Sequence, residues 1–168
     1  MIIHFFRRMA VSALFLGTIF ACDARADEFS LTGTWTLQSM VFVDEATGKA
    51  TKDFGEHPKG YSIYAPGGYL SVVINAEGRQ PVSATSDHAA EQRAQLLTSM
   101  VAHAGPYRFS DGKMVLKIEV AQDPRAVGTE LIRFIKVIDN NQLEAATPIT
   151  DLGNGKRVKI VLTWHRVA

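Results

Sequence analysis

Alternation of apolar and polar residues dominates this chain from Leu31 onward and predicts a protein built mainly of β-strands. Segments rich in β-branched and aromatic residues recur, and clusters of Gly, Pro, Asn and Asp separate them. The predicted strands span residues 33–43, 60–64, 69–75, 107–109, 113–121, 129–138, 142–147 and 157–167. This pattern indicates an all-β fold of about eight strands.

Short turns connect most of these strands. Pro66 and Gly67 suit the second and third positions of a tight turn, and Asp111-Gly112 is among the strongest short hairpin signals. Residues 44–59 instead form a long polar loop, which we expect to frame the mouth of the fold. Because consecutive strands are joined by hairpins, we expect an antiparallel, up-and-down order.

One segment departs from the strand pattern. Residues 87 to about 101 contain good helix formers, and Ala90, Ala94, Leu97 and Val101 recur at the spacing of one helix face. We therefore predict a single helix, inserted between the third and fourth strands. Its apolar stripe is expected to cover an opening or the outside of the sheet.

The two ends of the strand pattern carry matching signals. Gly33 and Trp35 lie in the first strand, and Arg166 lies in the last. We expect the sheet to close on itself so that the guanidinium of Arg166 lies across the indole of Trp35. The result is an eight-stranded barrel, which has no exposed edge strands and can enclose side chains or one small ligand.

The first 26 residues have the pattern of a secretory signal peptide. Arg7 and Arg8 precede an apolar run over 9–20, and a small-x-small cleavage site follows at 24–26. We predict cleavage after Ala26, which leaves residues 27–168 as one exported domain, periplasmic or secreted. The apolar run is shorter than the roughly 20 residues of a membrane-spanning helix, so no span is expected.

An alternative leader uses Cys22 as the lipidated first residue of a lipoprotein. Cleavage after Ala26 would instead remove Cys22, the one cysteine of the chain, and with it any disulfide. The remaining chain would carry 15 basic and 16 acidic residues, spread singly, so no nucleic-acid partner is expected. The histidines are isolated, which predicts neither a metal site nor a cofactor.

From Leu31 to Arg166 the sequence resembles the bacterial and fungal lipocalin-like domain proteins. The segments that carry the resemblance are 33–37, 60–69, 104–107, 124–133 and 162–166. The resemblance implies a calycin-type barrel, a class associated with apolar ligands and, in a few relatives, with enzymes acting on polyketide- or isoprenoid-like substrates. Members often carry a histidine pair where this chain has Leu116 and Lys117, so that feature does not carry over.

Arg133 is the most informative candidate for a binding residue. Strand alternation places it on the face of Leu131 and Ile135, and an inward guanidinium needs a carboxylate, either Glu119 or the acidic head of a ligand. In the alternative phase of the strand alternation, Ile132 and Phe134 point inward and Arg133 points outward.

Tyr64, Tyr107 and His103 are the other candidates for ligand contacts, because each joins an apolar ring to a hydrogen-bonding group. We expect a barrel that binds or carries a small hydrophobic or amphipathic molecule, as a monomer or weak homo-oligomer. The alternative is a cyclase or isomerase in which Tyr64, His103 or Glu119 moves a proton. A third hypothesis is a filled barrel that acts as an adaptor through its loops.

Overall fold

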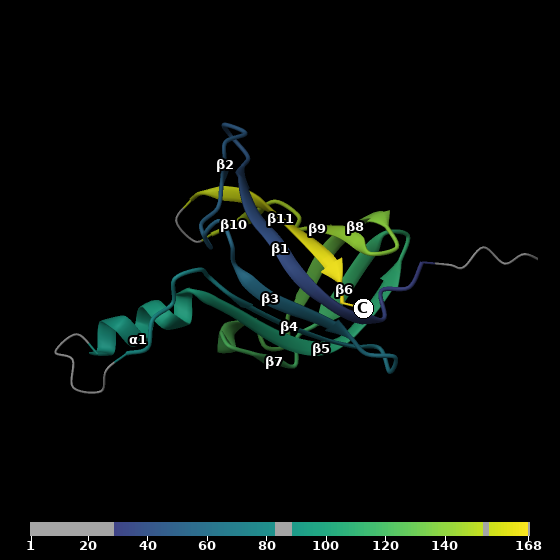
Figure 1. Cartoon of the computed structure of the whole chain (residues 1–168), viewed down its shortest axis with the longest axis horizontal. Coiled ribbons are helices and arrows are strands. Elements are labelled where there is room, and N and C mark those ends of the chain that lie inside the picture. The colour runs from purple at the N-terminus through teal and green to yellow at the C-terminus, as the bar shows by residue number, and fades with distance from the viewer. Residues whose placement is uncertain (1–28, 83–88, 153–154, 168) are drawn as a thin grey trace, which may run out of the picture.

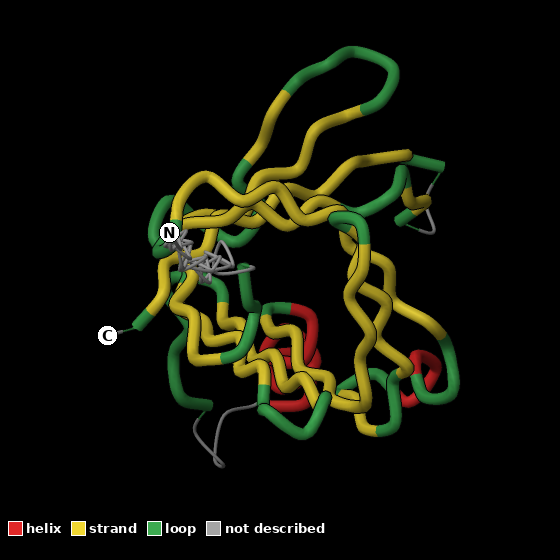
Figure 2. The backbone as a smooth tube through the Cα atoms, turned by 90° about the vertical axis from the view of Figure 1, so that its right-hand side faces the viewer, coloured by secondary structure: helices red, strands yellow, loops and turns green. Residues whose placement is uncertain are grey.

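The computed structural model describes residues 29–82, 89–152 and 155–167. The predicted leader with Cys22, the start of the predicted helix and His88 lie outside these ranges. Within them, strands wind into a closed ring, which Figure 2 shows end-on. Its eight main strands are β1 (Gly33–Asp44), β3 (Lys59–Tyr64), β4 (Tyr69–Asn75), β5 (Met100–Ser110), β6 (Lys113–Lys117), β8 (Glu130–Asp139), β9 (Gln142–Ala146) and β11 (Arg157–Arg166).

Every main strand pairs antiparallel with the next along the chain, and β11 returns to pair with β1. The predicted up-and-down barrel of eight strands is therefore confirmed. Three two-residue strands extend its rims: β2 (Ala50–Thr51), β7 (Val120–Ala121) and β10 (Thr150–Asp151). A helix, α1 (Ala89–Thr98), and a 3₁₀ turn at Pro124–Ala126 complete the described elements.

A β-bulge in β1 lets this one strand line the barrel along its whole length. The register with β11 shifts between Leu37 and Ser39. Before the shift Trp35 and Leu37 are buried, and after it Met40 and Phe42 are buried. Because side chains alternate with a period of two, the extra residue is what moves the inward set from odd to even positions.

Strand β5 begins at Met100, seven residues before the predicted start, because residues 100–106 pair with β4 along its full length. The predicted helix accordingly ends at Thr98. The predicted strand 113–121 is also interrupted between β6 and β7. The cause lies at Gly105 of β5. A Cβ at this position would come within 1.9 Å of the carbonyl oxygen of Lys117, so β5 and the end of β6 cross at a point where no side chain fits.

The expectation that α1 covers the barrel is wrong. None of its described residues is buried, Leu97 is 53% exposed, and the helix projects away from the strands (Figure 1). It is attached at its C-terminal end, where Arg79 Nη2 donates to the Leu96 carbonyl at 3.1 Å and Gln122 Nε2 donates to the Leu97 carbonyl at 2.6 Å. No helix in the described part of the chain is long and apolar enough to span a membrane.

Candidate functional site

One end of the barrel is closed by Trp35 and Arg166, which are direct partners in the β1–β11 register. Trp35 is fully buried, and its indole Nε1 donates to the Leu31 carbonyl at 2.8 Å. The central carbon of the Arg166 guanidinium lies 4.2 Å from the centroid of the Trp35 ring. This is the geometry of a cation–π contact.

Three carbonyl groups accept hydrogen bonds from the Arg166 guanidinium. Nη1 donates to Thr32 and Nη2 to Ser30, each at 2.7 Å, and Nε donates to Asn140 at 3.0 Å. Gly33 has a φ of +130°, and a Cβ there would meet Arg166 Nη1 at 3.0 Å. We call Trp35 and Arg166, with these three carbonyls, the clasp. It joins the first strand, the last strand and the 139–141 turn.

Beyond the clasp, the interior of the barrel contains a cavity of about 100 Å³. Most of its wall is apolar, contributed by strands from all around the barrel. Four polar side chains interrupt this wall: Ser62, Tyr64, His103 and Arg133. The apolar lining consists of Met40, Leu70, Val72, Ile74, Val101, Met114, Leu131, Ala145, Ile160, Leu162 and Trp164.

Arg133 lies on β8 and reaches this cavity, on the same side of the strand as Leu131 and the buried Ile135. Phe134, which the alternative phase placed inside, is 50% exposed. The Arg133 Nη1 donates to the carbonyl of Ile132 at 3.0 Å. Burial lowers the pKa of Arg133 to about 10, partly offset by Tyr64, so the guanidinium stays charged at neutral pH.

Glu119 is not the partner of Arg133, which corrects one of the two expected arrangements. Its side chain is exposed, in the turn between β6 and β7. The crossing at Gly105 ends β6 at Lys117, and Ile118 is the residue buried there. No carboxylate in the described ranges forms an ion pair with Arg133. Glu119 also lies outside the cavity, so it cannot move a proton there.

Tyr64 is buried on β3, and its ring meets Tyr107 edge-on, with the centroids 5.1 Å apart. Burial raises the pKa of Tyr64 to about 12; Ser62 and Arg133 act in the opposite direction. Tyr107 is not among the residues that line the cavity, and it packs against Tyr64 at the edge of the core. The hydroxyl of Tyr64 is therefore a neutral donor at physiological pH.

His103 lies on β5 and lines the same cavity. Burial lowers its pKa to about 4, and the nearby charge of Arg133 adds to the effect. The imidazole is consequently neutral at pH 7. The structure thus brings together three of the four predicted ligand contacts, Tyr64, His103 and Arg133, and adds Ser62, which alternation with Tyr64 along β3 had made available.

Phe54 packs against the core at the end of β1 that lies opposite the clasp. Its ring stacks on Phe42, near the far end of β1, with centroids 6.1 Å apart. Glu77 fastens the loop that carries Phe54: its backbone N–H donates to the Phe54 carbonyl at 2.9 Å, and its carboxylate accepts from the N–H groups of Glu56 and His57. The loop expected to frame the mouth is therefore attached here to β1 and to Glu77.

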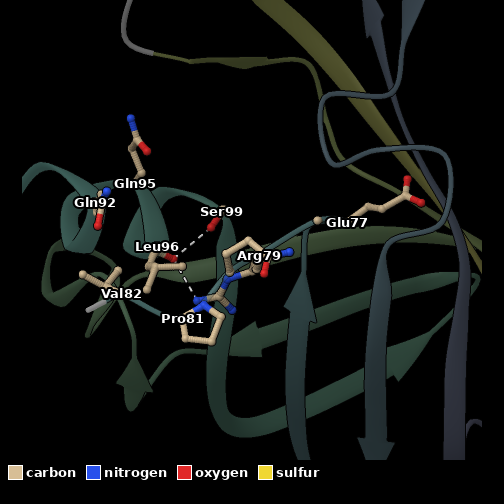
Figure 3. A pocket seen from close by; sticks show the side chains of 10 residues that line it. Glu77, Arg79, Pro81, Val82, Gln92, Gln95, Leu96 and Ser99 are labelled. Carbon is tan, nitrogen blue, oxygen red and sulfur yellow. Dashed lines mark hydrogen bonds between the residues drawn. The ribbon is translucent and has the colours of Figure 1, made fainter. Parts of the chain in front are cut away.

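A larger hollow, of about 390 Å³, lies outside the barrel between residues 77–82 and α1 (Figure 3). Arg79 crosses it and donates to the Asn75 side chain and to the Leu96 carbonyl. These contacts attach the helix to β4, so we assign Arg79 a structural role. Among the described residues, no three His, Cys, Asp or Glu side chains gather in a metal-binding arrangement.

The chain is similar to a known protein family and to designed β-barrels. A family model described as a lipocalin-like domain matches residues 32–167. No curated protein sequence matches the chain. Similar solved structures include a redesigned β-barrel, with a TM-score of 0.40 and 14% identity over 82% of this chain and 92% of that one. Another is a de novo designed fluorescence-activating β-barrel, with a TM-score of 0.38 and 13% identity over 81% and 93% of the two chains.

Proposed function

Since the chain belongs to the lipocalin-like domain family, we propose that it binds a small hydrophobic or amphipathic molecule inside the barrel. The observation that carries this proposal is the cavity inside the barrel, whose apolar wall is interrupted by four polar side chains at fixed positions. We further propose that the protein is exported by its first 26 residues to the periplasm or the medium, with lipidation at Cys22 as the alternative.

The protonation states of the cavity support binding over catalysis. A general acid or base works best when its pKa lies near the operating pH. The pKa of Tyr64 is raised to about 12 and that of His103 is lowered to about 4, so neither exchanges protons readily at pH 7. Each can still donate or accept a hydrogen bond. The cyclase or isomerase alternative rests on these two residues, since Glu119 lies outside.

The volume of the cavity limits what it holds without rearrangement. At about 100 Å³, it is smaller than the roughly 150 Å³ apolar cavity that accommodates benzene. Met40 and Met114 line it, and methionine side chains adapt their shape readily. A ligand larger than a few heavy atoms therefore requires these two side chains to move.

These methionines also provide the test. In protein labelled with ¹³C at the methionine methyl groups, toluene should shift the signals of Met40 and Met114 and leave that of Met100, which lies outside the cavity, in place. Ala145→Phe fills the cavity and should abolish the shifts. Ala146→Phe, at the next residue on the outer face of β9, is the matched control and should preserve them.

Ala145→Val is a milder filling variant in case Ala145→Phe fails to fold. It should weaken binding without unfolding the barrel. Unchanged spectra of Met40 and Met114 in saturating toluene would refute uptake into the cavity. Shifts that persist in Ala145→Phe would place the binding site elsewhere.

A further inference from the structure

We propose that the ligand class of the cavity is a compact organic monocarboxylate whose carboxylate binds Arg133. This inference rests on the proposed function and narrows it to one chemistry. It combines three observations: the charge of the cavity, the hydrogen-bonding groups at its wall, and its volume.

The charge of the cavity is unbalanced. Arg133 is the one charged side chain among the residues that line it, and no described carboxylate pairs with it. The other titratable groups in the wall, Tyr64 and His103, are neutral at pH 7. A buried charge without a partner is costly, and an anion bound beside it removes much of that cost. The single positive charge of Arg133 is balanced by a ligand that carries one negative charge.

The hydrogen-bonding groups match a carboxylate. A guanidinium presents five N–H donors in a planar fork, which suits the two oxygens of a carboxylate. One donor of Arg133 is used on the Ile132 carbonyl, and within the described residues its guanidinium makes no second hydrogen bond. The hydroxyl of Tyr64 and the imidazole of His103 line the same cavity and supply further polar contacts.

The volume and the wall exclude most other anions. A cavity of about 100 Å³ holds the equivalent of roughly three water molecules, or a ligand of about four to six heavy atoms. Its apolar wall leaves an inorganic anion such as phosphate without enough donors, whereas a short branched hydrocarbon can pack against Leu131, Met114 and Ile160. Isovalerate, a branched acid of seven heavy atoms, slightly exceeds this size and fits once Met40 and Met114 move, as toluene also requires.

The test compares isovalerate with isovaleramide, which has the same shape without the charge. At pH 7 the acid is ionised, and a hydrogen bond to a charged group should make isovalerate bind about tenfold more tightly or better. Dissociation constants come from titrations followed by the Met40 and Met114 methyl signals. Sodium chloride at matched concentration tests for a simple anion site.

Arg133→Met is the decisive variant. It replaces the guanidinium by an apolar side chain and removes a buried charge, so the barrel should fold at least as well as the wild type. It should lose the preference for isovalerate over isovaleramide and still take up toluene. Lys117→Met, which removes an exposed cation from β6, is the matched control and should retain the preference.

The outcomes separate the two proposals. Equal affinity for isovalerate and isovaleramide in the wild type, or a preference that survives Arg133→Met, would overturn the carboxylate class while leaving toluene uptake intact. Chloride that shifts the methyl signals and the melting temperature as much as isovalerate does would also overturn it, in favour of an inorganic anion. If toluene also leaves the Met40 and Met114 signals unchanged, the proposed function itself is refuted.

Discussion

Acidification should destabilise this barrel through His103. Its pKa lies at about 4 in the folded protein, against an ordinary value of 6.5 in the unfolded chain. Between these two values the unfolded state binds a proton that the folded state does not. The free energy of unfolding therefore falls as the pH drops from about 6.5 to 4. Below about pH 4 the stabilising contribution of the neutral imidazole is lost completely.

The magnitude follows from the two pKa values. At pH 7 both states carry a neutral imidazole, and the effect is negligible. At pH 5 the unfolded state is almost fully protonated at this residue while the folded state is largely neutral, which corresponds to a loss of about 2 kcal/mol. This is a substantial fraction of the 5–15 kcal/mol that typically stabilises a domain.

Urea unfolding at pH 7 and pH 5 measures the effect directly. Every titrating group contributes to the wild-type change, so the comparison with His103→Gln isolates one side chain. The wild type should lose about 2 kcal/mol more than His103→Gln over this interval. His57→Gln, which alters an exposed histidine on a loop, should follow the wild type.

Equal losses in the wild type and in His103→Gln would refute the argument, because they would mean that the folded protein does not hold this imidazole neutral. A second measurement checks the cause. Arg133→Met removes the nearby positive charge, so the pKa of His103, followed by NMR, should rise toward its ordinary value without reaching it. A pKa that did not move would leave burial as the whole explanation.

Two further predictions concern the framework. Arg166→Lys should lower the free energy of unfolding by about 2 kcal/mol and the melting temperature by several degrees, because an ammonium cannot stack on Trp35 while donating to three carbonyls. An unchanged melting temperature would argue against the clasp. Gly105→Ala should lower the free energy of unfolding by about 3 kcal/mol or more, since its Cβ would lie 1.9 Å from a carbonyl oxygen. At Gly67 a Cβ meets nothing within 4 Å, so Gly67→Ala should change the free energy of unfolding by less than about 0.5 kcal/mol. Comparable losses in the two glycine variants would contradict the crossing at Gly105.

Local pattern was enough to predict the barrel, because alternation and turn chemistry act over a few residues. The Asp111-Gly112 turn is of this kind: Asp111 has a φ of +51° and Gly112 one of +71°. The start of β5 is different, because Met100 follows directly on a run of helix formers. Pairing with Asn75 on β4 decides its conformation, and that contact is distant in sequence.

The cavity was predictable to the extent that strands were regular. Arg133 follows simple alternation along β8, and the structure places it where that alternation pointed. Glu119 was proposed as a partner for Arg133 from its charge, without its position in the strand alternation. Leu116 and Ile118 are the buried positions of that segment, so alternation places Glu119 on the outside. Phe54 left no such signal, since it lies in a polar loop and is placed by Glu77.

Two arginines in one barrel show how the same side chain can serve stability or binding. Arg166 donates to three carbonyls and lies on an indole, so the protein itself supplies contacts for its charge, and its replacement should act on stability alone. Arg133 is more deeply placed, yet its protein acceptor is one carbonyl of its own strand. The barrel bears the cost of that charge in the absence of any carboxylate partner among the described residues. Replacing Arg133 by an apolar residue should therefore raise stability and abolish the preference for an anion, whereas replacing Arg166 should do neither.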